Sequence, residues 1–222
     1  MFYDSYLLPI YPPDSQYMTV PYHCSLRKRL FDIVVSALLL ILLSPVLLIV
    51  MLLIYLDSPG RVLFSQQRVG KQGQCFTMWK FRSMCVDAEQ RKDELKEKNE
   101  VEGGIIFKIE DDPRVTRFGR FLRKCSMDEL PQLWNVLIGD MSLVGPRPAL
   151  PDEVVQYTPY QCQRLSVKPG ITGLWQISGR SKLKFSKQVE LDIEYINTQS
   201  FGHDLLILLK TIPAVLTGRG AE

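Results

Sequence analysis

The chain has 222 residues, of which 46% are hydrophobic and 23% charged, and its formal net charge at pH 7 is +3. This composition is typical of a globular protein, and so small a charge excess gives no support for nucleic acid as a partner. Five cysteines without a Cys-x-x-Cys pair, and only two histidines, argue against a disulfide framework and a zinc site and favour free thiols in a reducing compartment.

An uncharged apolar run from Ile33 to Leu56 is the first predicted element, interrupted only by Ser36, Ser44 and Pro45. It is long enough to enter a bilayer. Large and polar residues follow the run where a secretory signal would have small residues at a cleavage site, so we expect the segment to remain as an anchor.

Ser44-Pro45 lies at the middle of this run, where proline removes a backbone hydrogen bond and bends or breaks a helix. Basic residues occur on both flanks, at Arg27, Lys28 and Arg29 before the run and at Arg61, Arg68, Lys71, Lys80 and Arg82 after it. Lys and Arg collect on the cytoplasmic side of membranes, so this pattern favours a re-entrant helix-break-helix hairpin over residues 27–56. A spanning helix with a proline kink is the alternative. Residues 1–26 are then an N-terminal tail, and 57–222 a single cytoplasmic domain.

The domain is predicted to be an α/β fold rich in helix, with a small sheet. Short β-type runs at 62–64 and 76–81 predict a hairpin, and the charged residues 87–102 predict a solvated helix or loop. From Asp112-Pro113 a basic amphipathic helix is predicted, which suits an ordinary surface or contact with anionic headgroups. Helical patterns at 185–197 and 205–216 follow, and the second could pack in the core or lie in the membrane interface. Arginines recur every three residues in the basic helix, at Arg114, Arg117, Arg120 and Arg123.

The strongest group of reactive residues contains Asp128-Glu129-Leu130-Pro131. Either Ser126 or Asp128 could cap a helix here, and both starts place the two carboxylates at a helix N-terminus. The positive end of the helix dipole lowers a carboxylate's pKa, so we expect Asp128 to be an anionic nucleophile. Glu129 would hold Mg²⁺ or assist proton transfer. Simple capping of a helix by these two residues is the structural alternative.

Two loops rich in glycine and proline follow. The first is predicted over Gly139–Pro148, where Arg147 stands between two prolines, which suits the binding of an anionic oxygen pair. The segment Lys168–Arg180 combines basic ends with Trp175, which suits contact with a nucleotide. An exposed turn and a turn packed on the core are the respective alternatives.

Taken together, these motifs resemble the bacterial sugar transferases, the monotopic phosphoglycosyl transferases that act on polyprenyl phosphate. The resemblance covers almost everything from Arg27 onward. It rests on the Lys-Arg pair before an apolar segment with a central Ser-Pro and on the motifs Lys80-Phe81-Arg82-Ser83-Met84, Asp128-Glu129-Leu130-Pro131, Val144-Gly145-Pro146-Arg147-Pro148 and Lys168-Pro169-Gly170-Ile171-Thr172-Gly173.

The resemblance implies that Asp128 attacks the sugar-linked phosphorus of a UDP-sugar and releases UMP, forming a covalent aspartyl phosphosugar. Polyprenyl (undecaprenyl) phosphate then accepts the sugar phosphate, which initiates assembly of a glycan such as an exopolysaccharide, capsule or O-antigen. Mg²⁺ is expected at Asp128 and Glu129, and the hairpin is expected to rely on Lys28, Arg29, Ser44 and Pro45. The substrate-binding residues it implies are Lys80, Arg82, Arg123, Arg147, Arg180 and Asp192.

The expected location is the cytoplasmic (inner) membrane of a bacterium, with the catalytic domain facing the cytoplasm. The expected partners are a UDP-sugar, polyprenyl phosphate and the cytoplasmic leaflet, without nucleic acid, and a homodimer is left open. Two other functions remain open: a non-catalytic membrane-anchored adaptor in polysaccharide assembly, and a hydrolase that passes the intermediate to water. The sugar that is transferred is also left open.

Overall fold

The computed structural model describes residues 25–91, 109, 112–180 and 183–217. Within them the fold is rich in helix and has two small two-stranded sheets, which confirms the predicted fold class in its coarse form. The strands are β1 Leu63–Val69, β2 Cys75–Phe81, β3 Ser142–Val144 and β4 Gly170–Thr172. The α-helices are α1 Leu26–Asp57, α2 Arg117–Lys124, α3 Gln132–Ile138, α4 Pro151–Val154, α5 Pro159–Cys162, α6 Leu174–Ser178, α7 Phe185–Thr198 and α8 Phe201–Thr217.

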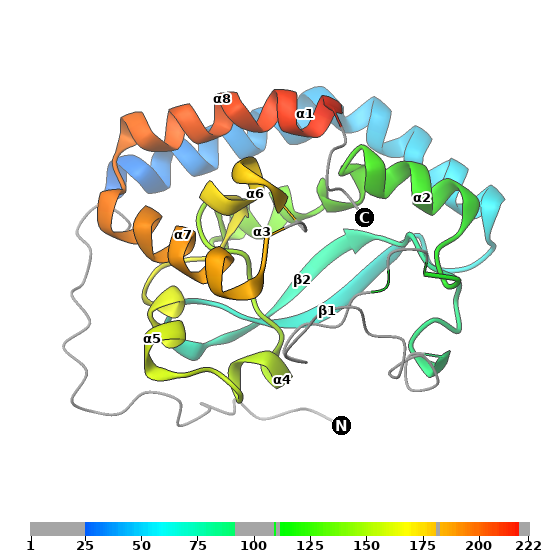
Figure 1. Cartoon of the computed structure of the whole chain (residues 1–222). Helices are drawn as coiled ribbons and strands as arrows, with labels where there is room; N and C mark the ends of the chain where they lie inside the picture. The colour runs from blue at the N-terminus through cyan, green and yellow to red at the C-terminus, as the bar shows by residue number, and fades with distance from the viewer. Residues whose placement is uncertain (1–24, 92–108, 110–111, 181–182, 218–222) are drawn as a thin grey trace.

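Helix α1 runs through Ser44-Pro45 without interruption. Pro45 has no N–H to donate to the carbonyl of Ile41, and the hydroxyl of Ser44 donates to that carbonyl instead, at 2.8 Å. Figure 1 shows that the helix axis changes direction near its middle. The predicted break between two helices is therefore wrong. The Ser-Pro pair bends one helix, because a neighbouring side chain satisfies the carbonyl that proline leaves free.

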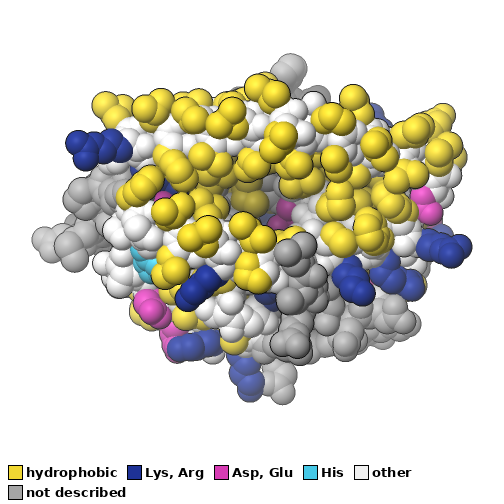
Figure 2. Space-filling view, turned by 90° about the horizontal axis from the view of Figure 1, so that it is seen from above, with side chains coloured by type: hydrophobic (Ala, Val, Ile, Leu, Met, Phe, Trp, Pro, Cys, Tyr) yellow, Lys and Arg dark blue, Asp and Glu magenta, His cyan; other side chains and the backbone are white. Residues whose placement is uncertain are grey.

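Helices α1 and α8 lie along the same side of the molecule (Figure 1), and the rings of Phe31 and Phe201 meet edge to face there with centroids 5.2 Å apart. Among the described residues, α1 is the one helix long and apolar enough to cross a membrane, and only 11% of its most apolar 18-residue stretch is buried. Figure 2 shows apolar side chains spread over this surface. The apolar face, as used below, is made by the exposed residues Leu38, Ile41, Leu42, Leu48, Ile49, Leu52, Leu205, Leu206, Leu209 and Ile212.

The predicted hairpin is confirmed: β1 and β2 pair antiparallel in a register that runs from Leu63 opposite Phe81 to Val69 opposite Cys75. The second sheet pairs β3 and β4 in parallel. An added Cβ at Gly170 would lie only 2.1 Å from the amide nitrogen of Gly145, so the two loops meet at a distance that a side chain would prevent. This pairing brings the predicted Arg147 loop beside the predicted Lys168–Arg180 segment.

Three apolar clusters form the core of the described part of the chain, and α1 packs on two of them. Phe31, Val35 and Leu39 from its first half contact the larger cluster, while Val50 and Ile54 from its second half belong to the smaller one. The larger cluster is made by Met78, Leu133, Val136, Met141, Leu143, Val144, Val167, Tyr195, Ile196 and Ile207. Helix α1 therefore covers the domain along its whole length.

The basic helix begins later than predicted. Helix α2 starts at Arg117, where the Thr116 hydroxyl caps it by accepting from the Gly119 amide at 3.0 Å. Arg114 lies outside the helix and folds back onto Asp112, with a nitrogen to oxygen distance of 2.6 Å. The four regularly spaced arginines therefore do not all lie on one helix, because Arg114 forms a buried ion pair outside α2. Most of the charged stretch 87–102 lies outside the described residues.

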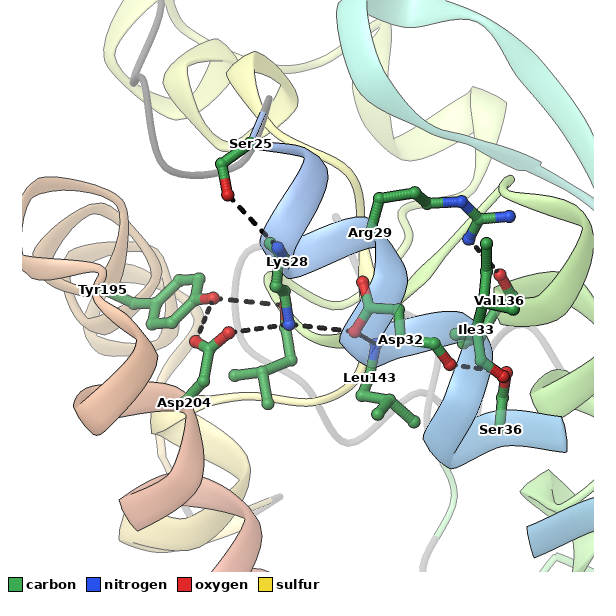
Figure 3. Close-up of polar contacts among 11 residues, drawn as sticks. Ser25, Lys28, Arg29, Asp32, Ile33, Ser36, Val136, Leu143, Tyr195 and Asp204 are labelled. Atoms are coloured by element: carbon green, nitrogen blue, oxygen red, sulfur yellow. Dashed lines mark hydrogen bonds and ion pairs between the residues drawn. The ribbon is translucent and has the colours of Figure 1, made fainter. Parts of the chain in front are cut away.

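Lys28 and Arg29, predicted to flank a membrane hairpin, serve the interior of the protein (Figure 3). The Lys28 ammonium is buried and lies 3.0 Å from a carboxylate oxygen of Asp32 and 2.6 Å from one of Asp204, and the Tyr195 hydroxyl donates to Asp204 at 2.7 Å. The Arg29 guanidinium donates to the carbonyls of residues 136 and 137 at the end of α3. Tertiary partners therefore take up both charges and hold the start of α1 on the domain, while the predicted part of these residues in a membrane hairpin stays a prediction.

Candidate active site

Asp128 and Glu129 lie on a single turn of 3-10 helix, Met127–Glu129, just before α3. Neither predicted cap forms: Ser126 stands at φ 52° in the left-handed region and its side chain makes no capping bond, and Pro131 is the residue at the start of α3. A non-glycine residue held in this region costs on the order of 1–3 kcal/mol, and such strain is concentrated at functional sites.

The two carboxylates line a cavity of 1290 Å³. One part of its wall is apolar and comes from α1 and α8, through Leu39, Leu43, Leu208, Ile212 and Val215. Figure 2 shows a hollow within the apolar face at which acidic side-chain atoms are visible. The cavity thus joins a charged interior to the apolar surface of the molecule.

Glu129 is held by two cations from separate elements. Its Oε1 lies 2.7 Å from Nζ of Lys80, on β2, and 3.6 Å from a guanidinium nitrogen of Arg147, in the loop after β3. Burial alone would raise the pKa of Glu129, but Lys80 and Arg147 outweigh burial and lower that pKa to about 2. Glu129 is therefore anionic throughout the physiological pH range.

Asp128 behaves in the opposite way. Burial raises its pKa and the neighbouring charge of Glu129 adds to this effect, while Lys80, Arg123 and Arg147 oppose it. The prediction that a helix N-terminus lowers the pKa of Asp128 is wrong, because desolvation exceeds any dipole effect of so short a turn. Two adjacent acids whose pKa values are displaced in opposite directions are the pattern expected when the two have different chemical roles.

Three more of the predicted basic residues line the same cavity. Arg123, in the last turn of α2, donates through Nε to the Ser83 hydroxyl at 3.0 Å, and burial lowers its pKa. The Arg82 guanidinium donates to the carbonyl of Ser58, just past the end of α1. Arg180 stands at φ 53°, and burial lowers its pKa while Glu129 opposes the shift. The structure therefore brings residues of four distant motifs around Asp128 and Glu129.

Asp192, the last predicted substrate-binding residue, is not brought into the cavity. It is 1% exposed and is paired with Arg164, whose Nε donates to Oδ2 at 2.7 Å. Burial raises the pKa of Asp192 to about 6 although Arg164 opposes the shift. Arg164 does line the cavity, so Asp192 acts on the site through the position of that guanidinium.

Sequence reasoning missed Arg68 and Arg164 as cavity residues. Arg68 was counted only among the charges that follow the membrane segment. In the structure Phe64, Gln66 and Arg68 share the more buried face of β1. The period-two spacing of polar residues in a strand is the signal that could have identified Arg68. Arg164 carries no such signal, because its ion-pair partner is 28 residues away in sequence.

A metal ion fits Asp128 and Glu129 only together with a substrate. No group of three or more His, Cys, Asp or Glu that could hold a metal ion occurs in the described part of the chain. Mg²⁺ retains several waters and is commonly bound by one or two carboxylates plus substrate phosphates. The two adjacent carboxylates match that donor set, with phosphate oxygens completing it.

Comparison with known proteins gives a consistent result. The family model described as bacterial sugar transferase matches residues 23–218. The galactosyl transferase CpsE of Streptococcus agalactiae is 49% identical over 198 residues, which are 89% of this chain and 44% of that protein. The undecaprenyl-phosphate galactose phosphotransferase of Salmonella typhimurium is 43% identical over 197 residues, or 87% of this chain and 41% of that one. The exopolysaccharide production protein ExoY of Sinorhizobium fredii is 42% identical over 199 residues, 88% of each chain. This chain thus spans less than half the length of the first two relatives and most of the third.

Proposed function

The chain belongs to the bacterial sugar transferase family, and from this premise we propose that it transfers a sugar 1-phosphate from a UDP-sugar to undecaprenyl phosphate or another polyprenyl phosphate. The observation that carries the proposal is the cavity, in which two acids with oppositely displaced pKa values lie among cations, beneath an opening on the apolar face. A water-soluble nucleotide and a lipid phosphate could both reach such a site. The name of the Salmonella relative specifies the same lipid and a sugar phosphate.

In the proposed first step, a carboxylate oxygen of Asp128 attacks the sugar-linked phosphorus of the UDP-sugar. The bond from that phosphorus to the bridging oxygen breaks, and the electron pair leaves with UMP. In the second step, an oxygen of the lipid phosphate attacks the same phosphorus. The aspartyl oxygen then leaves with its electron pair, which restores the carboxylate and yields the polyprenyl diphosphate sugar.

The surrounding side chains prepare Asp128 for this role. A carboxylate with a raised pKa is the more basic of the pair, so Asp128 is a better nucleophile than Glu129 once it is ionised. Lys80 and Arg147 already face the anionic Glu129 and supply positive charge where the phosphate oxygens would lie. Glu129 fixes these cations and Asp128 forms the bond.

Mg²⁺ is part of the proposal, held by Asp128 and Glu129 together with the donor's phosphates. When bound, it would neutralise phosphate charge and favour departure of UMP. Removal of divalent cations with EDTA is therefore expected to abolish UMP release, and added Mg²⁺ to restore it. UMP release that is insensitive to EDTA would remove the metal from the proposal.

The proposed setting is the cytoplasmic leaflet of a bacterial inner membrane, with α1 re-entrant and the catalytic domain facing the cytoplasm. The packing of α1 supports this arrangement. Its buried residues run from Lys28 to Ile54, so the domain contacts both halves of the helix. A helix that crossed the bilayer would have to carry one of these contact regions through the hydrocarbon. Its exposed apolar side chains would instead enter the leaflet from one side.

The mechanism is tested by trapping the intermediate. Purified protein with a UDP-sugar and no lipid is expected to release about one equivalent of UMP and to gain the mass of a sugar phosphate on Asp128. UDP-galactose is the first donor to try, since two relatives are named for galactose. An Asp128→Asn variant should lose both signals. Normal turnover by that variant would refute the mechanism, and steady release of free sugar phosphate without lipid would identify a hydrolase.

A further inference from the structure

Arg68 is a buried cation for which the mechanism above has no use. Only 9% of the residue is exposed. Its guanidinium donates to the carbonyl of Pro148 at 3.1 Å and to the amide oxygen of Gln66 at 2.7 Å, and Nε has no partner. No carboxylate among the described residues lies within ion-pair distance of it. A buried charge without a counter-charge is costly unless an anion arrives to neutralise it.

A second guanidinium lies next to Arg68. Arg147 directly precedes Pro148, whose carbonyl accepts a hydrogen bond from Arg68. Burial is the larger cause, and the charge of Arg147 the second, of a pKa of Arg68 that is lowered to about 10. Both side chains line the cavity. The Glu129 carboxylate lies 3.6 Å from Arg147 and is shared with Lys80, and the charge of Glu153, which also lines the cavity, acts on Arg68 from beyond ion-pair distance. Two guanidinium groups with this surplus of positive charge suit the terminal phosphate of a monoester.

Arg68 and Arg147 share the cavity with the reacting acids and with apolar side chains of α1 and α8. A small recess is lined by Arg68, Arg147, Glu129 and Ile171. Thr172, the next residue, has its hydroxyl oxygen 2.8 Å from that of Thr211 on α8, and both threonines line the main cavity. An anion at the arginine pair would therefore lie beside Glu129 and in the same cavity as the α8 wall, where an apolar chain would enter.

The chemistry of the proposed reaction restricts where the lipid phosphate can bind. Attacking and leaving oxygens lie roughly in line on opposite sides of a transferred phosphoryl group. Asp128 attacks opposite UMP in the first step, and the lipid phosphate must attack opposite Asp128 in the second. The lipid phosphate must therefore occupy the position that UMP has just left.

We propose that Arg68 and Arg147 form one anion site that is used twice, first by the departing phosphate of UMP and then by the phosphate of the lipid acceptor. This inference rests on the proposed function and adds Arg68 to it as a substrate-binding residue. One site with two successive occupants requires that UMP and the lipid phosphate exclude one another. A separate site for each would allow both to bind together.

The test is product inhibition of the full-length protein in detergent or vesicles, with UMP as the inhibitor and undecaprenyl phosphate as the varied substrate. Inhibition that is competitive with the lipid supports the shared site, and non-competitive inhibition overturns it without any variant. If the wild type releases no UMP from any UDP-sugar, the proposed function itself has failed. The two failures are thus distinguishable.

Variants then test Arg68. Arg68→Gln is expected to raise the inhibition constant of UMP and the KM for the lipid by a common factor of about tenfold to a hundredfold, since a charge-assisted contact to phosphate is lost. Arg68→Lys keeps the charge, should fold if the glutamine variant does not, and should give a smaller common rise. Lys187→Gln, which removes an exposed charge from α7 outside the cavity, should leave both constants unchanged. A rise in only one of the two constants would overturn the assignment.

Discussion

At the scale of single residues, the buried pair of Arg164 and Asp192 shows how a charge that never meets substrate can shape the site. Both residues are more than nine-tenths buried, and Arg164 reaches the cavity while Asp192 does not. Aromatic rings of Tyr157 and Phe185 lie beside the guanidinium, at 5.8 and 5.7 Å from its carbon. The pair therefore fixes one cation of the cavity wall in a single orientation.

Replacing Arg164 with Gln is expected to destabilise the protein by about 3–5 kcal/mol at pH 7.5, because Asp192 is left buried without its partner. The pKa of Asp192 is already raised to about 6 and should rise further. An acid whose folded pKa exceeds its unfolded pKa binds a proton on folding, so stability falls as pH rises from about 4 through the folded pKa. The loss should thus be smaller at pH 5 than at pH 7.5, as measured by chemical unfolding.

The double variant Arg164→Gln/Asp192→Asn is the control for this experiment. It also removes the Asp192 charge, which the single variant leaves buried without a partner. The double variant should therefore recover part of the stability and lose the extra pH dependence. Equal destabilisation at both pH values would contradict the assignment of the effect to Asp192.

At the scale of elements, helix α2 is seated on the end of β2 by a contact that admits only glycine. A Cβ at Gly119 would lie 2.0 Å from the carbonyl oxygen of Ser83. The amide of Thr116 donates to that same carbonyl at 3.1 Å, and Arg123 donates to the Ser83 hydroxyl at 3.0 Å. The close approach therefore positions Arg123 beside Asp128.

Gly119→Ala is expected to push α2 away from β2, at a cost of about 1–3 kcal/mol from overpacking, and to slow the first half-reaction by displacing Arg123. Unfolding and the rate of UMP release without lipid would measure the two effects. Gly202→Ala on α8 is the matched control, because nothing lies within 4 Å of an added Cβ there. That variant should retain wild-type rates, and a wild-type rate for Gly119→Ala would show that the seating of α2 does not matter for chemistry.

Elements with strong local patterns were predictable from sequence, whereas features decided by distant partners were not. The hairpin of β1 and β2 and the helix at 185–198 follow from local spacing and turn residues. The bend at Pro45 did not become a break, because Ser44 satisfies the free carbonyl of Ile41. The ion pair of Lys28 with Asp204 was not predictable either, because Asp204 is far along the chain and no local pattern reveals that contact.

The same distinction applies to the site. The sequence motifs were sufficient to identify Asp128, Glu129 and most of the cations that surround them in the cavity. They could not show the direction in which the pKa of Asp128 is displaced, because that direction depends on how much of the carboxylate folding removes from water. Asp192 was misplaced because its ion pair with Arg164 forms only in the tertiary structure.

At the scale of the whole molecule, the apolar face adjoins the cavity that holds Asp128 and Glu129. Helices α1 and α8 supply both the exposed apolar side chains and part of the cavity wall. In the proposed arrangement α1 enters one leaflet and returns, so its two ends face the same compartment.

Single-cysteine variants at Arg27 and Asp57, in a background without the native cysteines, test this arrangement. Both positions are exposed at opposite ends of α1. In sealed vesicles an impermeant thiol reagent is expected to label both from the same side. Labelling of the two from opposite sides would establish a simple span, and it would require the contacts of one half of α1 with the domain to be absent in the membrane.

Because α1 packs on two clusters of the core, the helix that is proposed to enter the membrane is also needed to complete the fold. Without α1, the larger cluster would lose Phe31, Val35 and Leu39 from its cover, and the smaller one would lose Val50 and Ile54. The carboxylate of Asp204, which accepts from the Tyr195 hydroxyl, would lose its ion pair with the Lys28 ammonium. A fragment that lacks α1 is therefore not expected to fold into the catalytic domain. In the proposed arrangement the element that anchors the protein and the element that covers its core are one and the same helix.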